Sequence, residues 1–288
     1  MDIGSNTTRL LVADAGRRAC HPVGQERVFT RLGAATGRDG VVAAAKVSEL
    51  AEVVGEQVAS ARALGAERIA VIGTAALRHA ANRAELCAAV TRTCGVGLRI
   101  LSAAEEGRLA FAGATLATPA GPDPLVVIDV GGGSTEVVAG RVGASGRAVG
   151  SVWSLPIGSG LLTDRLVSGD PPGAAEIDGL REESRRALHV VTGGGFARAL
   201  AAGGSATSLG RVVGAQLDDV ALEAALGRLC AAPAAEVAAA LGLHPERVRL
   251  LPAGLILLEA AGRRLGAPLE VAGGGVREGA VCQLAGRL

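Results

Sequence analysis

The sequence predicts an α/β protein built from two related halves. Short apolar stretches typical of buried strands alternate with longer helical patterns along the chain. A turn rich in glycine and hydroxyl residues, preceded by an acid, occurs twice, at residues 2–8 and 129–136. The acids of the two turns, Asp2 and Asp129, lie 129 − 2 = 127 residues apart. The repeated pattern predicts two half-molecules that face one ligand.

Length, composition and charge narrow the class of protein. A chain of 288 residues that is 49% apolar suits two modest domains with a sizeable core. No apolar run approaches the roughly 18 residues of a membrane-spanning helix. The net charge of +1 and 1% aromatic residues argue against DNA, membrane and base-stacking partners. The five cysteines are scattered without CxxC spacing, which indicates reduced thiols and a cytoplasmic location.

The elements of the first half follow from apolar runs that end at glycines or caps. They are, in order, strands 9–16 and 26–32, helix 43–64, strand 68–73, a helix with Arg78 and Asn82 on one face, helix 84–93, strand 98–101 and a helix capped by Ser102. Four apolar residues, 125–128, lead into Asp129, whereas only Met1 stands before Asp2. We therefore expect the natural start of this chain to lie upstream of Met1.

The second half begins after a segment rich in proline and glycine, residues 118–124. This segment predicts two domains, 1–117 and 118–288. The predicted elements are strands 125–130, 134–140 and 147–155, a turn at 154–160 that leads into a helix, helix 174–190, strand 200–202, a turn at 203–207 before a helix, helices 218–229, 234–241 and 247–264, strand 269–272 and a terminal helix. We expect that terminal helix, at about 277–288, to pack back on the first domain.

Three turns of glycine, serine and threonine, at residues 4–8, 131–135 and 203–207, suit phosphate groups. Backbone N–H groups and hydroxyls donate to oxyanions without a net charge. A P-loop is excluded, because its lysine motif is absent and the single lysine, Lys46, lies in a predicted helix. Any anion site must therefore use arginine, and the candidates are Arg31, Arg78 and Arg277, whereas Arg9 fits a structural strand position.

Acidic residues suggest what happens to the bound phosphate. Hydrolysis of a phosphoanhydride needs an activated water, charge neutralisation and alignment. Glu105 or Glu106 could act as general base, and only one of these adjacent acids can face inward from a helix. Asp2, Asp129 and Glu136 are candidate ligands for Mg²⁺, with Mn²⁺ as the alternative.

The ordered series of motifs resembles the exopolyphosphatase / guanosine pentaphosphate phosphatase family, within the superfamily of actin-like ATPases, sugar kinases and acetate kinases. The similarity covers nearly the whole chain. It rests on residues 2–6, 74–78 with Asn82, 102–108, 129–136, 154–158 with 162–164, 203–205 and 276–279. The glycine turn alone fits many actin-like ATPases, so the specificity lies in the order of the motifs.

The resemblance implies two actin-like (ribonuclease H-like) domains with mixed sheets flanked by helices and a cleft between them. It implies removal of terminal phosphates from inorganic polyphosphate or from a (p)ppGpp-type nucleotide, with Mg²⁺, and it raises the expectation of a homodimer. Glu106 matches the general base, and Asp129 and Glu136 match acids that hold the metal or position water. With the glycine turns, the resemblance predicts phosphate contacts from Gly4, Ser5, Asn6, Arg78, Gly131, Gly132, Gly133, Ser134, Thr135, Gly204, Ser205 and Arg277.

The chain departs from the family pattern at Leu161, where members often have arginine, and at Ser205, where threonine is usual. A C-terminal HD-type extension of longer members is absent, which predicts a preference for shorter polyphosphates or for nucleotides. Guanosine pentaphosphate phosphatase is the first alternative function. An actin-like nucleotide-binding scaffold and a sugar or acetate kinase are others, although the Glu-Glu-Gly-Arg segment at 105–108 favours water as phosphoryl acceptor.

Overall fold

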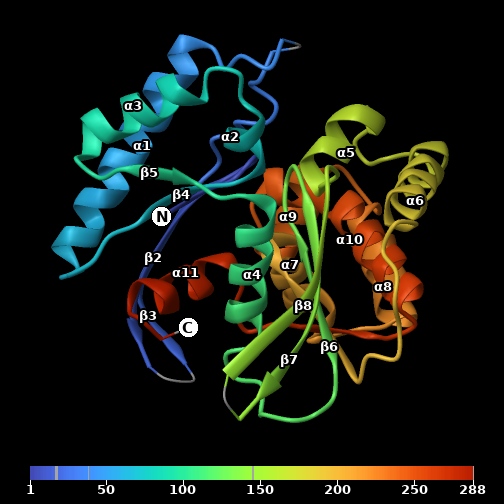
Figure 1. The fold of residues 1–288 in the computed structure, drawn as a ribbon. Coiled ribbons are helices and arrows are strands. Elements are labelled where there is room, and N and C mark those ends of the chain that lie inside the picture. Colours follow the sequence, from blue (N-terminus) through green and yellow to red (C-terminus); the bar gives the residue numbers. More distant parts are fainter. Residues whose placement is uncertain (17–18, 38, 145, 288) are drawn as a thin grey trace.

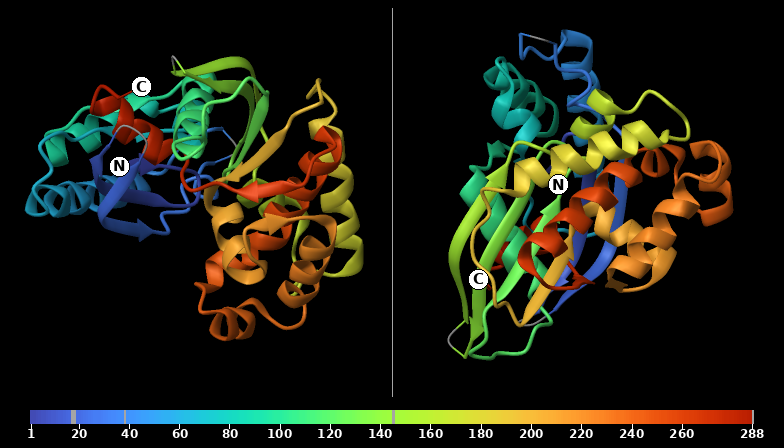
Figure 2. Two further views of the ribbon diagram at one scale, coloured as in Figure 1. Left: turned by 90° about the horizontal axis from the view of Figure 1, so that it is seen from below. Right: turned by 90° about the vertical axis from the view of Figure 1, so that its right-hand side faces the viewer.

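The structure is a computed structural model that describes residues 1–16, 19–37, 39–144 and 146–287. Two sheets, each covered by helices, lie side by side (Figures 1 and 2). Along the chain the strands of the first sheet are β1 (Asp2–Ile3), β2 (Thr8–Ala15), β3 (Cys20–Val28), β4 (Val71–Gly73) and β5 (Leu98–Ile100). Those of the second are β6 (Leu125–Val130), β7 (Thr135–Gly143), β8 (Gly146–Leu155), β9 (Arg198–Ala202), β10 (Gln216–Leu217) and β11 (Leu269–Val271).

The two sheets share one topology, and this positions the two turns alike. The first has the order β3-β2-β1-β4-β5 and the second β10-β11-β9-β6-β7-β8. β1 is antiparallel to β2 and parallel to β4, just as β6 is antiparallel to β7 and parallel to β9. All six residues of β6 are buried, as expected for a strand covered on both faces. β1 contains only two residues.

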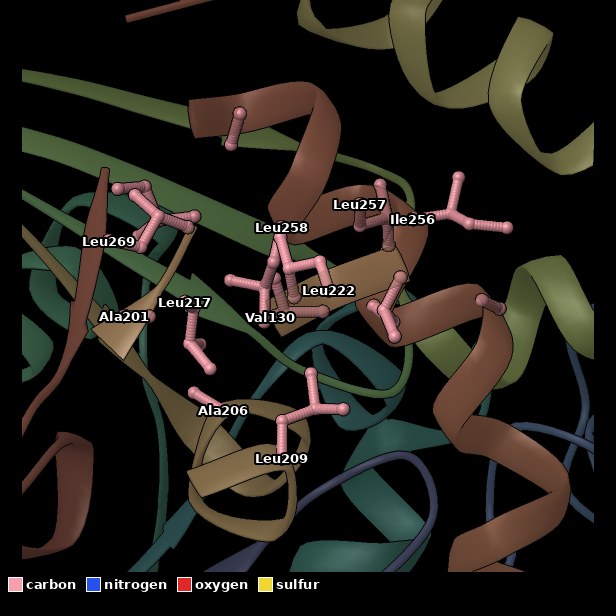
Figure 3. Packing of buried hydrophobic residues seen from close by; sticks show 14 of the residues in the cluster. Val130, Ala201, Ala206, Leu209, Leu217, Leu222, Ile256, Leu257, Leu258 and Leu269 are labelled. Carbon is pink, nitrogen blue, oxygen red and sulfur yellow. The ribbon is translucent and has the colours of Figure 1, made fainter. Parts of the chain in front are cut away.

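Helices cover both sheets, and each half of the molecule has its own hydrophobic core. The helices of the first half are α1 (Ala44–Ala63), α2 (Ala75–His79), α3 (Arg83–Cys94) and α4 (Ala103–Ala114). Those of the second are α5 (Ser159–Leu166), α6 (Ala174–Leu188), α7 (Gly203–Val213), α8 (Asp219–Leu229), α9 (Ala234–Leu241), α10 (Pro245–Leu265) and α11 (Val276–Leu284). α10 is buried on several sides, and its side chains Ile256, Leu257 and Leu258 belong to the hydrophobic core of the second half (Figure 3).

Two helices, α4 and α11, lie between the sheets and join the halves (Figure 2). Phe111 of α4 packs on the second sheet, while Leu109 packs with Ile72 of the first sheet and with Val276 of α11. A Cβ on Gly113 would lie 2.8 Å from the backbone N of Gly279, so the crossing is close only because both positions are glycine. α11 contacts α4, β2 and β3. The assignment of the terminal helix to the first domain stays a prediction. The domain boundary at residue 117 stays a prediction.

Most predicted elements are present, with three corrections. The turns predicted at 154–160 and 203–207 are partly or wholly helical, because α5 begins at Ser159 and α7 at Gly203. The strand predicted over 26–32 is instead β3, Cys20–Val28. The chain leaves the sheet at Phe29, whose ring stacks on His244 at 4.3 Å, so apolar character there serves a contact with the other half. Arg78 and Asn82 do not share a helix face, because α2 ends at His79. Asn82 instead begins α3 and its side chain bonds both backbone groups of Val42.

None of the helices in the described ranges is both long enough and apolar enough to span a lipid bilayer.

Candidate active site

The two glycine turns are closed by the same backbone hydrogen bond, and they contact each other. We define the first glycine turn as residues 4–7 and the second as residues 131–134. The N–H of Gly4 donates to Thr7 O, and that of Gly131 to Ser134 O, both at 3.0 Å. A Cβ on Gly132 would lie 2.5 Å from Asn6 Nδ2, so only glycine permits this approach. The contact brings the polar backbone of both turns to one place.

A cavity of about 290 Å³, which we call the central cavity, lies beside this contact. Both halves of the molecule contribute to it, so it occupies the cleft between the two sheets. It is lined by Asp2, Gly4, Ser5, Asn6, Thr7, Arg9, Gln25, Thr74, Ala75, Glu106, Asp129, Val130, Gly131, Gly132, Gly133, Ser134, Glu136, Ser159, Gly203, Gly204, Thr207, Arg247, Ala272, Gly273, Gly274, Gly275, Val276, Arg277 and Glu278.

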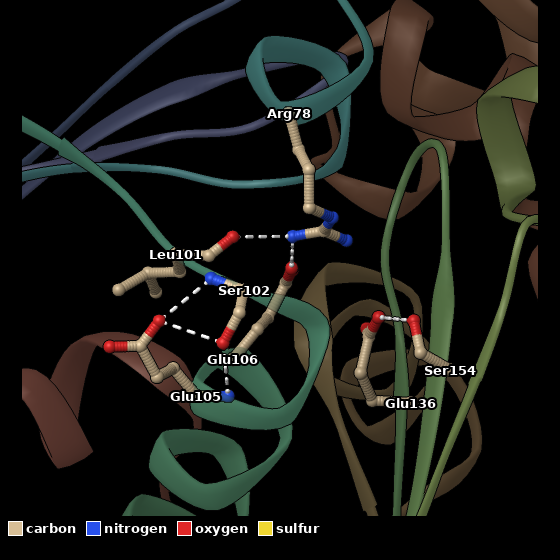
Figure 4. A network of polar contacts seen from close by, with 7 residues as sticks. All are labelled: Arg78, Leu101, Ser102, Glu105, Glu106, Glu136 and Ser154. Carbon is tan, nitrogen blue, oxygen red and sulfur yellow. Dashed lines mark hydrogen bonds and ion pairs between the residues drawn. The ribbon is translucent and has the colours of Figure 1, made fainter.

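Two acids of the second half enter the cavity from adjacent strands. Asp129 on β6 lies opposite Glu136 on β7, and each is less than 10% exposed. Ser154 Oγ donates to Glu136 Oε1 at 2.9 Å (Figure 4). Burial, with repulsion from Glu106 and Asp2, raises the pKa of Asp129 to about 7. Burial and the charges of Glu106 and Asp129 raise the pKa of Glu136 well above its usual value. These carboxylates therefore need a cation or a proton.

Only one of the adjacent acids on α4 faces the cavity. Glu105 points away and closes a capping box with Ser102, whose backbone N–H donates to Glu105 Oε2 at 2.8 Å (Figure 4). Glu106 is 6% exposed, and Arg78 Nη1 donates to its Oε2 at 2.8 Å. Burial raises the pKa of Glu106, while the Arg78 guanidinium opposes that rise. Because Arg78 also donates to Leu101 O at 2.9 Å, it fixes the position of the Glu106 carboxylate.

Two arginines of the cavity lining, Arg9 and Arg247, approach the N-terminus of α7. A Cβ on Gly204 would lie 2.5 Å from Arg9 Nη2 and 2.9 Å from Arg247 Nη2. Burial, with repulsion from neighbouring arginines, lowers the pKa of Arg9 to about 10 and that of Arg247 to about 9. Arg247 is 4% exposed, and its Nε has no hydrogen-bond partner among the described residues. A helix N-terminus beside the half-buried Arg9 and the buried Arg247 is an environment for an anion.

The acids also provide a test of whether the site suits a divalent cation. Asp2, Asp129 and Glu136 supply the carboxylate oxygens that a hard cation prefers, and Asp2 Oδ1 is buried without a hydrogen-bond partner. Within the described ranges, no group of three or more His, Cys, Asp or Glu side chains is spaced as a complete metal site. The residues therefore fit a Mg²⁺ ion held by one or two carboxylates that keeps much of its water.

Comparisons with known proteins agree with this geometry. The model of the Ppx/GppA phosphatase family matches residues 11–288. The chain belongs to the Ppx/GppA phosphatase family. It is 30% identical to exopolyphosphatase 2 of Mycobacterium tuberculosis over 295 aligned positions, covering 92% of this chain and 89% of the relative. It is 29% identical to exopolyphosphatase 1 of Mycobacterium leprae, covering 92% of this chain and 82% of that one.

Solved structures show the same fold. The crystal structure of the Aquifex aeolicus member of the Ppx/GppA family has a TM-score of 0.81 at 25% identity, with 99% of this chain and 95% of that chain covered. The predicted fold class, two actin-like domains with mixed sheets and a cleft, is thereby confirmed, as is the predicted family. As a member of the Ppx/GppA phosphatase family, the chain is a hydrolase that acts on phosphoanhydride bonds.

In this Ppx/GppA phosphatase, most of the predicted site residues meet at the central cavity. Those that line it are Asp2, Gly4, Ser5, Asn6, Glu106, Asp129, Gly131, Gly132, Gly133, Ser134, Glu136, Gly204 and Arg277. Their roles in binding and catalysis remain proposals.

Four predicted contacts lie elsewhere in the structure. Thr135 is turned inward, where its hydroxyl donates to Ile157 O at 2.7 Å. Ser205 is buried against Gly254 of α10. Arg78 reaches Glu106 but does not line the cavity, and Arg31 pairs with Glu246.

Sequence reasoning missed Arg247 and assigned Arg9 to structure. Arg9 lies in β2 directly opposite Asp2, so strand pairing across the first glycine turn carries it to the cavity. The sequence did contain a signal for Arg9, because it follows Asp2 by the same number of residues as Glu136 follows Asp129. Arg247 had no such signal, because it stands in a long helix pattern far from any glycine turn.

Proposed function

We propose that this chain is an exopolyphosphatase that removes terminal phosphates from short inorganic polyphosphate chains. The observation that carries the proposal is the buried, arginine-paired Glu106 facing the two glycine turns inside the central cavity. The names of the mycobacterial relatives support the choice of substrate. The cavity lining in the described ranges includes no aromatic residue on which a guanine base would stack, which favours polyphosphate over guanosine pentaphosphate.

The terminal phosphate is bound by the backbone N–H groups of the two glycine turns, with Ser5, Asn6 and Ser134 as further donors. The following phosphates of the chain extend toward Arg9, Arg247 and the N-terminus of α7. This assignment places negative charge where cations and N–H groups are concentrated. Asp2 lies opposite Arg9, and Asp129 lies beside Gly203 at the start of α7, so these carboxylates border the proposed path of the chain. The Arg277 guanidinium favours the charged form of Asp2 and so opposes the rise in its pKa.

Glu106 accepts a proton from the attacking water while the water oxygen forms a bond to the terminal phosphorus. The bridging P–O bond breaks, and the shortened chain leaves with the electron pair as an anion. Arg78 keeps Glu106 ionised before the reaction, and burial makes the carboxylate a stronger base than it would be in water. One or two of the carboxylates of Asp129, Glu136 and Asp2 would hold Mg²⁺, or Mn²⁺ in its place, and the ion would neutralise charge on the phosphoryl oxygens.

The test is orthophosphate release from short polyphosphate, long polyphosphate and guanosine pentaphosphate, with Mg²⁺, Mn²⁺ or a chelator. We expect the wild type to be fastest on short polyphosphate and inactive with chelator. Glu106→Gln should lower kcat by about 10²-fold or more, whereas the matched variant Glu105→Gln should retain it, since Glu105 faces away from the cavity.

Near-normal activity of Glu106→Gln on every substrate would overturn the mechanism. Release from guanosine pentaphosphate alone would overturn the substrate and support the first alternative. The homodimer is part of the same proposal, and light scattering of the purified protein tests it separately.

A further inference from the structure

Arg247 lines the central cavity among neighbours that repel it. Its side chain is buried, and its Nε has no hydrogen-bond partner in the described part of the chain. Burial, with repulsion from Arg9 and Arg27, lowers the pKa of its guanidinium to about 9. An arginine side chain has many rotamers, so repulsion alone would let it turn away from the cavity. Some other contact must hold the guanidinium where it is.

An aromatic ring from the first half makes such a contact. Arg247 Cζ lies over the ring of Phe29, 6.0 Å from its centroid. The same ring stacks on His244, with the centroids 4.3 Å apart and the planes inclined by 22°. His244 is the N-cap of α10, and Arg247 lies in the first turn of that helix. Because the face of an aromatic ring attracts a cation, most strongly where water is excluded, Phe29 offsets part of the repulsion on Arg247.

The backbone just after Phe29 is bonded to the first glycine turn. The N–H of Arg31 donates to Asn6 O at 3.0 Å, and the N–H of Gly33 donates to Ser5 O at 2.8 Å. Arg31 has a φ of 47°, in the left-handed region that residues other than glycine rarely adopt. Such a conformation persists where the surrounding contacts fix it. The ring of Phe29 therefore stands on a segment that is tied to the turn.

These contacts form a bridge across the cleft. One end is the first glycine turn, where the proposed function places the terminal phosphate, and the other is Arg247, where it places the following phosphates. We propose that Phe29 is a positioning residue, whose ring holds the Arg247 guanidinium at a fixed place relative to the first glycine turn. Phe29 lies outside the lining of the central cavity, so it acts on the phosphate chain through Arg247. The inference rests on the proposed function, because it concerns how that same site binds the phosphates beyond the terminal one.

A second contact joins the same two segments and provides the control. Arg31 forms an ion pair with Glu246, and both side chains lie outside the lining of the central cavity. The Arg31 side chain is 54% exposed, so water screens the pair and weakens it. Glu246→Gln therefore removes a contact between the two segments but keeps the ring beside Arg247.

The first test is steady-state kinetics on short polyphosphate. Phe29→Leu keeps an apolar side chain but removes the ring, and should raise KM by about 3- to 20-fold while kcat stays within about twofold. Phe29→Tyr keeps the ring and should hold KM within about twofold of wild type, as should the control Glu246→Gln. Equal KM values for Phe29→Leu and Phe29→Tyr would overturn the proposal. So would a Phe29→Leu variant that loses kcat and Tm with an unchanged KM, since the role would then be merely structural.

The second test is whether the ring acts through the guanidinium. In the Arg247→Gln background, Phe29→Leu should raise KM by less than about 1.5-fold, since no guanidinium is left for the ring to position. The same fold-increase in both backgrounds would overturn the proposal. If Phe29→Leu folds poorly, His244→Asn takes its place, because asparagine keeps the N-cap while loss of the stacking partner should raise KM by about two- to fivefold. An unchanged KM would then overturn the proposal.

A binding measurement separates the role of Phe29 from the proposed function. Calorimetric titration of metal-free protein with inorganic tripolyphosphate should show the same fold-increase in Kd for Phe29→Leu as the kinetics show in KM. A wild type that binds tripolyphosphate but releases no orthophosphate would contradict the proposed function, and the ratio of Kd values would still test Phe29. Wild-type activity with unchanged Kd and KM in Phe29→Leu would contradict the role of Phe29 alone. Absence of tripolyphosphate binding to the wild type would overturn both.

Discussion

The two glycine turns are built alike, but the residues that follow them, Arg9 and Glu136, have opposite charges. In both, an acid precedes the turn by two residues, and the same N–H to carbonyl bond closes it. In both, the residue seven positions after the acid lies directly opposite it on the next strand. That residue is Arg9 in the first half and Glu136 in the second. The same local structure thus places a cation opposite the acid of the first half and a second acid opposite the acid of the second half.

This difference separates the two tasks of the site. The Arg9 side, with Arg247 and the N-terminus of α7, attracts the phosphate chain. The Glu136 side, with Asp129 and Glu106, handles water and the proposed cation. A symmetric pair of acids would repel the substrate, and a symmetric pair of arginines would have no base nearby. Each prediction below alters one side or the contact between them.

The largest effect is expected on the acidic side. Glu136→Gln keeps the shape and an oxygen that can still accept the hydrogen bond from Ser154, but removes the charge. We expect kcat to fall by about 10²-fold with a smaller change in KM, because the lost charge acts on water and the cation rather than on the chain. Steady-state kinetics on short polyphosphate measures this. The control variant Ser154→Ala keeps the charge of Glu136 and should lose much less of kcat. Activity of Glu136→Gln within about threefold of wild type would contradict the division of tasks between the acidic and basic sides.

The matched change on the basic side is Arg9→Gln. We expect KM for polyphosphate to rise by about 10- to 100-fold with a smaller fall in kcat, since a charged hydrogen bond is worth about 1.5–3 kcal/mol. The dependence of KM on ionic strength should also weaken. Arg27→Gln is the control, because Arg27 pairs with Arg9 across β2 and β3 but is exposed and outside the cavity lining. Equal effects of the two variants would remove Arg9 from the site.

A smaller effect is expected where the turns touch. Gly133→Ala places a methyl group against Ser5 Oγ, so the two turns must separate slightly. We expect a loss of about 1–3 kcal/mol in the free energy of unfolding and about a tenfold loss of activity. Ser5→Gly in the same chain should recover part of the stability, as a double-mutant cycle would show. Gly121→Ala, where a Cβ meets nothing within 4 Å, should be silent.

The parts of this architecture that were predictable from sequence are those with a local physical signature. Glycines next to hydroxyl residues mark close backbone approach, and Ser102 marks the start of α4. The local pattern predicts that one of Glu105 and Glu106 faces inward, and the family resemblance selects Glu106. The fold class followed from strand and helix alternation together with the order of the motifs.

What could not be predicted depends on contacts between segments that are distant along the chain. Phe29 belongs to a stack with His244, so its apolar character was wrongly taken as strand character. Ser205 resembles a phosphate donor in sequence, but the close approach of Gly254 on α10 buries it. Arg247 reaches the cavity only through the packing of α10. In each case the deciding neighbour lies at least 40 residues away.

The smallest predicted effect compares the acids that precede the two turns, in metal-free protein with chelator. Burial raises the pKa of Asp129 to about 7 in the folded chain, from an ordinary value of 3.8, so the folded state binds the extra proton. The carboxylate therefore costs no stability below about pH 4, and stability falls as the pH rises from about 4 to 7. Asp129→Asn removes that cost and should raise Tm by about 5 °C at pH 8 but not at pH 4.

The equivalent change Asp2→Asn should give a smaller gain at pH 8. Burial also raises the pKa of Asp2, but Arg9 and Arg277 oppose that rise and stabilise the charged form. The difference between the two variants, measured by thermal melting across this pH range, therefore reports the charge asymmetry of the two turns directly. A gain for Asp2→Asn that equals or exceeds that for Asp129→Asn would show that Arg9 does not compensate the acid opposite it. The cationic side would then have to be assigned to Arg247 alone.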